Sequence, residues 1–85
     1  MMHVTVVSPV QAVFDGVADA VVAPAYDGLV GILPRHAAFL TLLGTGKLTL
    51  RQGATTTRLQ VSGGFLQVVQ GGDTVRIVAD RVDQS

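Results

Sequence analysis

The chain has 85 residues, no net formal charge and 48% apolar residues, so it has the length and apolar content for one domain with its own core. Lys47 and the five arginines are scattered along the sequence, whereas nucleic-acid-binding proteins gather basic residues on one face. No apolar run approaches the roughly 20 residues of a membrane-spanning helix. We therefore expect no nucleic-acid partner and no direct membrane insertion, and the absence of cysteine excludes disulfides.

Turn residues divide the first half of the chain into short strand patterns. The β-branched run that begins at His3 ends before Pro9, because proline cannot donate to a continuing ladder. Asp15-Gly16 and Tyr26-Asp27-Gly28 are typical turn sequences. Strands are predicted at residues 3–8, 11–15, 17–23 and 29–33.

The second half of the chain is also rich in strand patterns. Residues 47–52 alternate, with Leu48 and Leu50 facing the core. Residues 37–43 are apolar on both faces, so a helical turn and a short strand both fit them. Further strands are predicted at residues 58–61, 64–70 and 74–80. Because this spacing leaves no room for crossover helices, the pattern predicts an all-β fold, an antiparallel sandwich or barrel.

No constellation of residues predicts catalysis. The sequence at 44–48, Gly-Thr-Gly-Lys-Leu, partly matches a phosphate-binding loop but lacks the earlier glycine and the Ser or Thr after the lysine. His3 and His36 are far apart in the sequence and neither has another histidine nearby, so no metal site is predicted. Ser8 and Ser62 lack the local sequence of a nucleophile elbow. We expect no catalytic residue, no metal and no cofactor.

Residues 27–39 are the most distinctive stretch, because they place two glycines, Pro34 and His36 between two apolar segments. Their sequence, Asp-Gly-x-x-Gly-Ile-Leu-Pro-x-His-Ala, resembles the signature of the ε subunit of F-type ATP synthases. The sequences Ser-Gly-Gly-Phe at 62–65 and Val-Arg-Ile-Val-Ala-Asp at 75–80 resemble later strands of that family, in the right order. The resemblance covers essentially the whole chain.

This resemblance implies one domain at residues 1–85, the N-terminal domain of the ε subunit. That domain is an antiparallel β-sandwich of about eight to ten short strands. Many family members continue into a C-terminal helical hairpin that inhibits ATP hydrolysis or binds ATP. We expect this chain to lack the hairpin and both of those activities.

The implied function is that of a rotor subunit, which couples the γ shaft to the membrane c-ring during proton- or sodium-driven ATP synthesis. It would be non-catalytic by itself and would work at the cytoplasmic face of the bacterial inner membrane. By resemblance, the residues expected to contact the c-ring loops are Gly28, Leu29, Val30, Gly31, Arg35 and His36. Small or apolar outward residues would contact the γ subunit, and the candidates are Ala38, Thr41, Leu43 and Val69.

Two residues depart from the family pattern, and other interpretations stay open. Leu29 stands where members often have an acidic residue and Arg35 where glycine is common, so we expect a more acidic partner surface. His36 could instead be a solvated loop imidazole, and Gly63-Gly64 could mark a bulge or a close strand crossing. The alternative function is a stand-alone β-sandwich that binds a peptide or small ligand, which a deep apolar pocket would favour.

Overall fold

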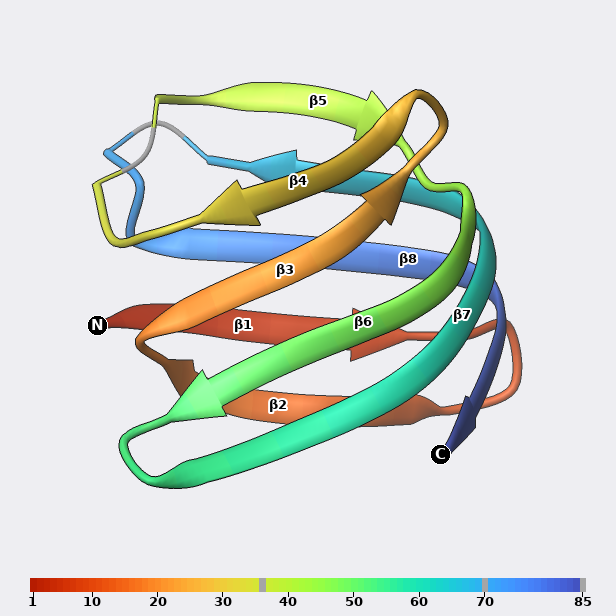
Figure 1. Cartoon of the computed structure of the whole chain (residues 1–85), viewed down its shortest axis with the longest axis horizontal. Helices are drawn as coiled ribbons and strands as arrows, with labels where there is room; N and C mark the ends of the chain where they lie inside the picture. The colour runs from red at the N-terminus through yellow and green to blue at the C-terminus, as the bar shows by residue number, and fades with distance from the viewer. Residues whose placement is uncertain (36, 70, 85) are drawn as a thin grey trace.

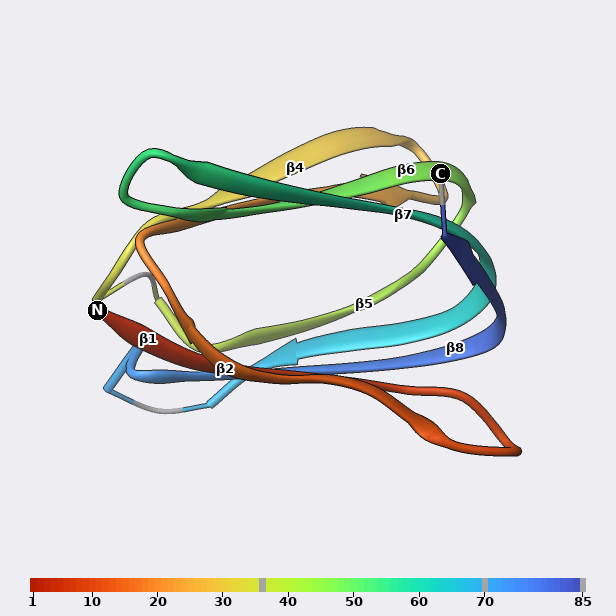
Figure 2. The same ribbon diagram turned by 90° about the horizontal axis from the view of Figure 1, so that it is seen from below.

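The computed structural model of the chain describes residues 1–35, 37–69 and 71–84. Within these residues, eight strands form one continuous sheet that folds into two facing layers (Figures 1 and 2). The strands are β1 (Met2–Val7), β2 (Ala12–Ala18), β3 (Ala20–Ala25), β4 (Gly28–Ile32), β5 (Phe39–Leu42), β6 (Thr45–Gln52), β7 (Thr55–Val68) and β8 (Thr74–Gln84). The expected all-β sandwich is confirmed.

The strand order is β2-β1-β8-β7-β6-β3-β4, and β5 pairs with β7 beside this path. Figure 2 shows β3, β4, β6 and the first half of β7 in one layer. The other layer holds β1, β2, β5, the second half of β7 and most of β8. Among the described residues, β1 and β8 form a parallel pair and the other pairs are antiparallel, so the expectation of purely antiparallel pairing was wrong for this one pair.

The strand β7 crosses from one layer to the other at Gly63 and Gly64. The sequence suggested two strands, 58–61 and 64–70, but the structure has one strand of 14 residues. Both glycines have positive φ, 70° and 105°, a region that other residues rarely adopt. A Cβ on Gly64 would collide with the carbonyl oxygen of Val78, so β8 lies directly against this bend. The alternative of a close strand crossing is thereby confirmed.

The bend also changes which side chains point inward. Leu59 and Val61 are buried before the bend, and Leu66 and Val68 are buried after it. The inward positions therefore shift from odd to even numbers, and one strand supplies core residues to both layers. Aliphatic side chains fill the space between the layers, and Leu48 and Leu50 are fully buried as predicted.

The turn predicted at Asp15-Gly16 is wrong. Both residues lie inside β2, where they pair with β1. The chain bends instead at Asp19, whose N–H donates to the Arg51 carbonyl at 2.7 Å. The Asp19 carboxylate accepts a hydrogen bond from the Gly53 N–H at 2.6 Å. An aspartate can fix a bend in the chain through hydrogen bonds of its own side chain. The partners of Asp19, Arg51 and Gly53, are distant in sequence, so the local sequence does not reveal this bend.

The stretch with two interpretations, residues 37–43, forms the short strand β5 and no helical turn. Its pairing with the second half of β7 satisfies its backbone groups. The described residues contain no helix that could span a membrane.

Candidate functional site

The family signature forms the edge strand β4 and the turn that follows it. Gly28 and Gly31 are exposed, and the Leu29 side chain is 76% exposed. Val30 differs, because its side chain packs against the core. Val30 therefore also has a structural role, its expected contact with the c-ring stays a prediction, and the other three positions face solvent.

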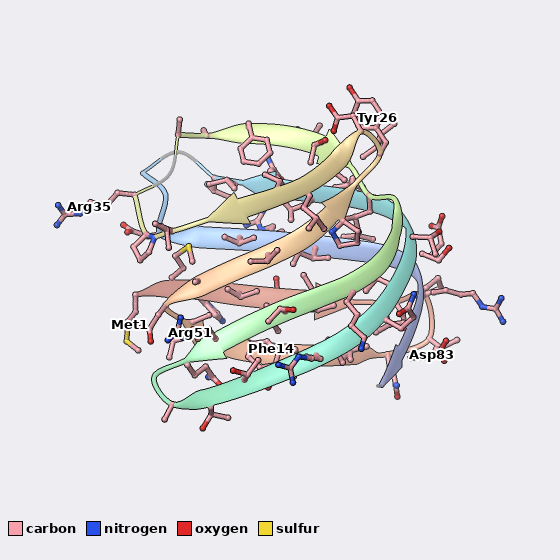
Figure 3. The ribbon with its side chains drawn as sticks, viewed as in Figure 1. Met1, Phe14, Tyr26, Arg35, Arg51 and Asp83 are labelled. Carbon is pink, nitrogen blue, oxygen red and sulfur yellow. The ribbon has the colours of Figure 1, made fainter. Side chains whose placement is uncertain are left out.

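Arg35 occupies an unusual backbone conformation at one end of the sandwich. Its φ is 68°, and it is the one non-glycine residue with positive φ in the described part of the chain. Its N–H donates to the Gly72 carbonyl at 3.1 Å, and the Gly72 N–H donates to the Val69 carbonyl at 2.9 Å. The turn after β4 is thereby fixed to the β7–β8 hairpin. Figure 3 shows the exposed Arg35 side chain pointing away from the body of the molecule. His36 lies outside the described residues.

Replacing Arg35 in two ways separates its backbone from its side chain. We expect Arg35→Gly to be more stable than Arg35→Ala by about 0.5–1 kcal/mol, because a Cβ at positive φ costs about 1–2 kcal/mol and the flexibility of unfolded glycine offsets part of the gain. Both variants lose the guanidinium equally. Urea unfolding of the two variants measures the difference, and equal stability or a more stable alanine variant would contradict it.

The four residues expected to contact γ do not form one surface. Leu43 is only 5% exposed and belongs to the core, so its expected outward role is wrong. Thr41 and Val69 are half-buried, and Ala38 is exposed. Val69 begins the β7–β8 hairpin, where its N–H donates to the Thr74 carbonyl at 3.0 Å. The expected residues are scattered because side chains alternate along the pleated strand β5. Phe39, Thr41 and the following Leu43 therefore point toward the interior.

The outward side of β5 carries an apolar patch that the sequence did not reveal. Leu40 is 66% exposed, Leu42 is 62% exposed, and Phe65 on the neighbouring strand is 39% exposed. Leu42 lies directly opposite Phe65 in the β5–β7 register. With Thr41 and Gln67, these side chains line an open depression of about 370 Å³. We call Leu40, Leu42 and Phe65 the β5 patch.

The β5 patch was missed because β5 reverses the usual pattern. A polar residue in a half-buried strand normally faces water, which would have placed Thr41 outside and its two leucine neighbours inside. In the structure Thr41 is half-buried, and its hydroxyl donates to the Leu42 carbonyl at 3.5 Å. Exposed leucines beside an inward threonine are a signal of a surface that a partner covers.

The rest of the described surface carries an exposed His–Asp pair and a second depression. The described residues hold no cluster of three or more His, Cys, Asp or Glu side chains that could bind a metal. His3 and Asp15 form an exposed pair, with the ring Nε2 and carboxylate Oδ1 2.5 Å apart. A second depression, also of about 370 Å³, is lined by small or apolar residues, by Thr49 and Thr56, and by the exposed arginines Arg51 and Arg58. Neither depression is a closed pocket.

A family model described as the β-sandwich domain of the ATP synthase delta/epsilon chain matches residues 1–85. The chain belongs to this family. Its epsilon chains are non-catalytic subunits of ATP synthase.

Individual relatives of this delta/epsilon family agree with the match. The chain is 40% identical over 74 residues to the ATP synthase epsilon chain of Caulobacter vibrioides, covering 87% of this chain and 86% of that one. It is 45% identical over 84 residues to the epsilon chain of Acidithiobacillus ferridurans, covering 99% of this chain and 58% of that one. The chain thus spans most of one relative and little more than half of another.

Solved structures of two mitochondrial ATP synthases contain the same fold. A chain in the Euglena gracilis OSCP/F1/c-ring structure aligns with a TM-score of 0.88 at 20% identity, covering 98% of this chain and 52% of that one. A chain in the Tetrahymena thermophila central stalk and c-ring structure aligns with a TM-score of 0.79 at 22% identity, covering 98% and 66%. These likenesses support the delta/epsilon sandwich fold.

Proposed function

We propose that this chain is a rotor subunit of the central stalk, which holds the γ shaft on the c-ring during ion-driven ATP synthesis. The observation that carries the proposal is the presence of two separate exposed surfaces on one close-packed sandwich. One is the β5 patch on a lateral face, and the other is the end formed by β4 and Arg35. A close-packed sandwich keeps such surfaces in a fixed relation and can transmit force between them.

The β5 patch is the proposed contact for γ. Exposed leucines beside an aromatic ring are typical of the apolar centre of a protein interface. Ala38 lies just before β5 and is exposed, whereas Leu43 is buried in the core. We place Leu40, Leu42 and Phe65 at the centre of the γ contact, in place of the four residues expected from the sequence.

The exposed end is the proposed contact for the c-ring loops. Gly28, Leu29 and Gly31 offer an apolar edge without bulky neighbours, and Arg35 adds one positive charge. A guanidinium binds carboxylates through paired hydrogen bonds, so an acidic ring loop fits this end best. The proposed site of action is the cytoplasmic face of the bacterial inner membrane, and the similarity to bacterial epsilon chains supports it.

The available surface suffices for two partners. The chain exposes 4883 Å² in total. A typical stable interface takes roughly 800 Å² from each partner, so two interfaces would use about a third of this surface. The alternative of a small-ligand module is not favoured, since the apolar depression is open to solvent.

Co-elution with the γ subunit of the same organism tests the proposal. We expect the chain and γ to leave a size-exclusion column together at micromolar concentration, as a one-to-one complex. The free chain, run alone, provides the control for elution position. Separate elution at every concentration tested would contradict the proposed shaft contact.

A further inference from the structure

The strand β4 ends the path of the sheet, so among the described residues one of its two backbone edges has no partner strand. It pairs with β3, and no strand that the structure describes lies beyond it in its layer (Figures 1 and 2). β5 lies above β4 in Figure 1, but it pairs with β7, and Figure 2 shows it rising from the other layer. Only its end reaches the β3–β4 turn, where the Tyr26 N–H donates to the Leu42 carbonyl at 3.1 Å. An exposed edge carries unpaired N–H and C=O groups that can pair with another chain.

The register identifies which backbone groups are free. Leu29 lies opposite Pro24, which has no N–H to donate. The Pro24 carbonyl accepts a hydrogen bond from the Gly44 N–H at 2.8 Å, on the side away from β4. Leu29 therefore belongs to a non-hydrogen-bonded pair of the β3–β4 ladder, and so does Gly31, two residues further. The N–H and C=O groups of Leu29 and Gly31 point out from the free edge.

This edge is short, but it carries none of the charges, prolines or bulges that also protect edge strands. Residues 28–32 contain no charged residue and no proline, and their register with β3 is regular, without a bulge. The Leu29 side chain is 76% exposed. A Cβ built on Gly28 or Gly31 would meet no atom within 4 Å, so another backbone can approach both positions.

We propose that the free chain self-associates by antiparallel pairing of β4 with β4 of a second copy. A two-fold axis at Val30 places Leu29 of each copy opposite Gly31 of the other copy. Both residues of each such pair carry free backbone groups, as a hydrogen-bonded antiparallel pair requires. The large Leu29 side chain then lies over a glycine, where space is open.

Charge favours the second copy in this orientation. Asp27 precedes β4 and Arg35 follows it shortly after its end, and both are exposed. Antiparallel pairing brings the acidic end of one strand toward the basic end of the other, whereas parallel pairing would bring like charges together. The charged ends therefore select the antiparallel dimer.

The length of the edge limits the strength of the dimer. Five residues of strand span roughly 17 Å, so the pairing buries far less than the roughly 800 Å² per partner of a stable complex. The dimer is therefore transient and belongs to the unassembled chain, because it covers the strand proposed to meet the ring. The dimer proposal does not depend on the proposed function, because it is argued only from the unpaired backbone edge of β4.

Sedimentation velocity of the full chain from about 20 µM to 1 mM tests the dimer, a range that brackets weak association. We expect the weight-average mass to rise above the 8.8 kDa monomer as concentration increases. Gly31→Pro removes one free donor at the edge, and Leu29→Lys places a charge there. Each is expected to weaken association at least tenfold, with unchanged circular dichroism.

Matched variants separate this edge from other surfaces. Gly31→Ala keeps the N–H, and Val10→Lys adds the same charge at an exposed apolar residue between β1 and β2, so both are expected to self-associate like the parent. Exchange of the charged ends in Asp27→Arg/Arg35→Asp preserves association, whereas Arg35→Asp alone weakens it. A chain that stays monomeric at 1 mM would overturn the proposal. A dimer abolished by Leu42→Asp but kept by Gly31→Pro would overturn it too, by assigning association to the β5 patch.

Discussion

A Leu42→Asp variant is expected to lose at least about 100-fold in affinity for the γ subunit, which corresponds to roughly 3 kcal/mol. Leu42 is 62% exposed in the free chain and lies opposite Phe65 in the β5 patch. Docking of γ would bury this position, and an unpaired carboxylate there would lose its hydration without a compensating partner. Calorimetric titration of γ with both forms of the chain measures the loss.

Val10→Asp is the matched control, since it introduces the same charge at an exposed apolar residue elsewhere. Val10 is 88% exposed and lies between β1 and β2, away from β5. We expect this variant to bind γ as the parent does, and both variants to keep the parent's thermal unfolding midpoint within a few degrees. Binding by Leu42→Asp at parental affinity would show that γ docks elsewhere.

Gly64→Ala is expected to destabilise the fold by about 4 kcal/mol or more, a large part of the roughly 5–15 kcal/mol that holds a small domain folded. Gly64 has a φ of 105°, which alanine avoids. The added Cβ would also meet the Val78 carbonyl oxygen, which belongs to the paired backbone of β8 and cannot move alone. The bend that carries β7 between the layers would have to open.

Urea unfolding of Gly64→Ala and Gly31→Ala side by side tests this expectation. Gly31 lacks the positive φ of Gly64, and a Cβ there meets no atom within 4 Å. We expect Gly31→Ala to change the free energy of unfolding by no more than about 0.5 kcal/mol. Equal stability of the two alanine variants would show that the strand crossing at residue 64 tolerates a side chain.

The sequence predicted what depends on local pattern and missed what depends on distant partners. Alternation placed Leu48 and Leu50 correctly in the core, because a half-buried strand needs only its own period of two. Asp15-Gly16 was wrongly predicted to form a turn, because the residues around it in the sequence do not show that it pairs with β1. The strand predicted at residues 58–61 ended before Gly63-Gly64 for the same reason: β8 and the backbone of residues 43 and 44, which are distant in sequence, pair with β7 there and keep it continuous.

The candidate site divides in the same way. The motif at 27–39 marked the exposed end, since glycine and proline reveal unusual backbone in any context. It could not reveal that Val30 faces the core, which the pairing of β4 with β3 decides. The β5 patch was missed because its apolar residues lie on the outside of a strand whose orientation is set by β7. A surface that binds a partner can place apolar residues outside, which contradicts the rule that the apolar residues of a strand face the core.

The position of β1 in the sheet has a consequence for synthesis on the ribosome. β1 lies between β2 and β8, so the first strand pair joins the main body of the sheet through the last strand. A nascent chain exposes the apolar sides of β1 and β2 until residues 74–78 have emerged from the exit tunnel and paired with β1. Folding is therefore completed after translation of the whole domain, and the N-terminal hairpin is the segment that a chaperone would meet first.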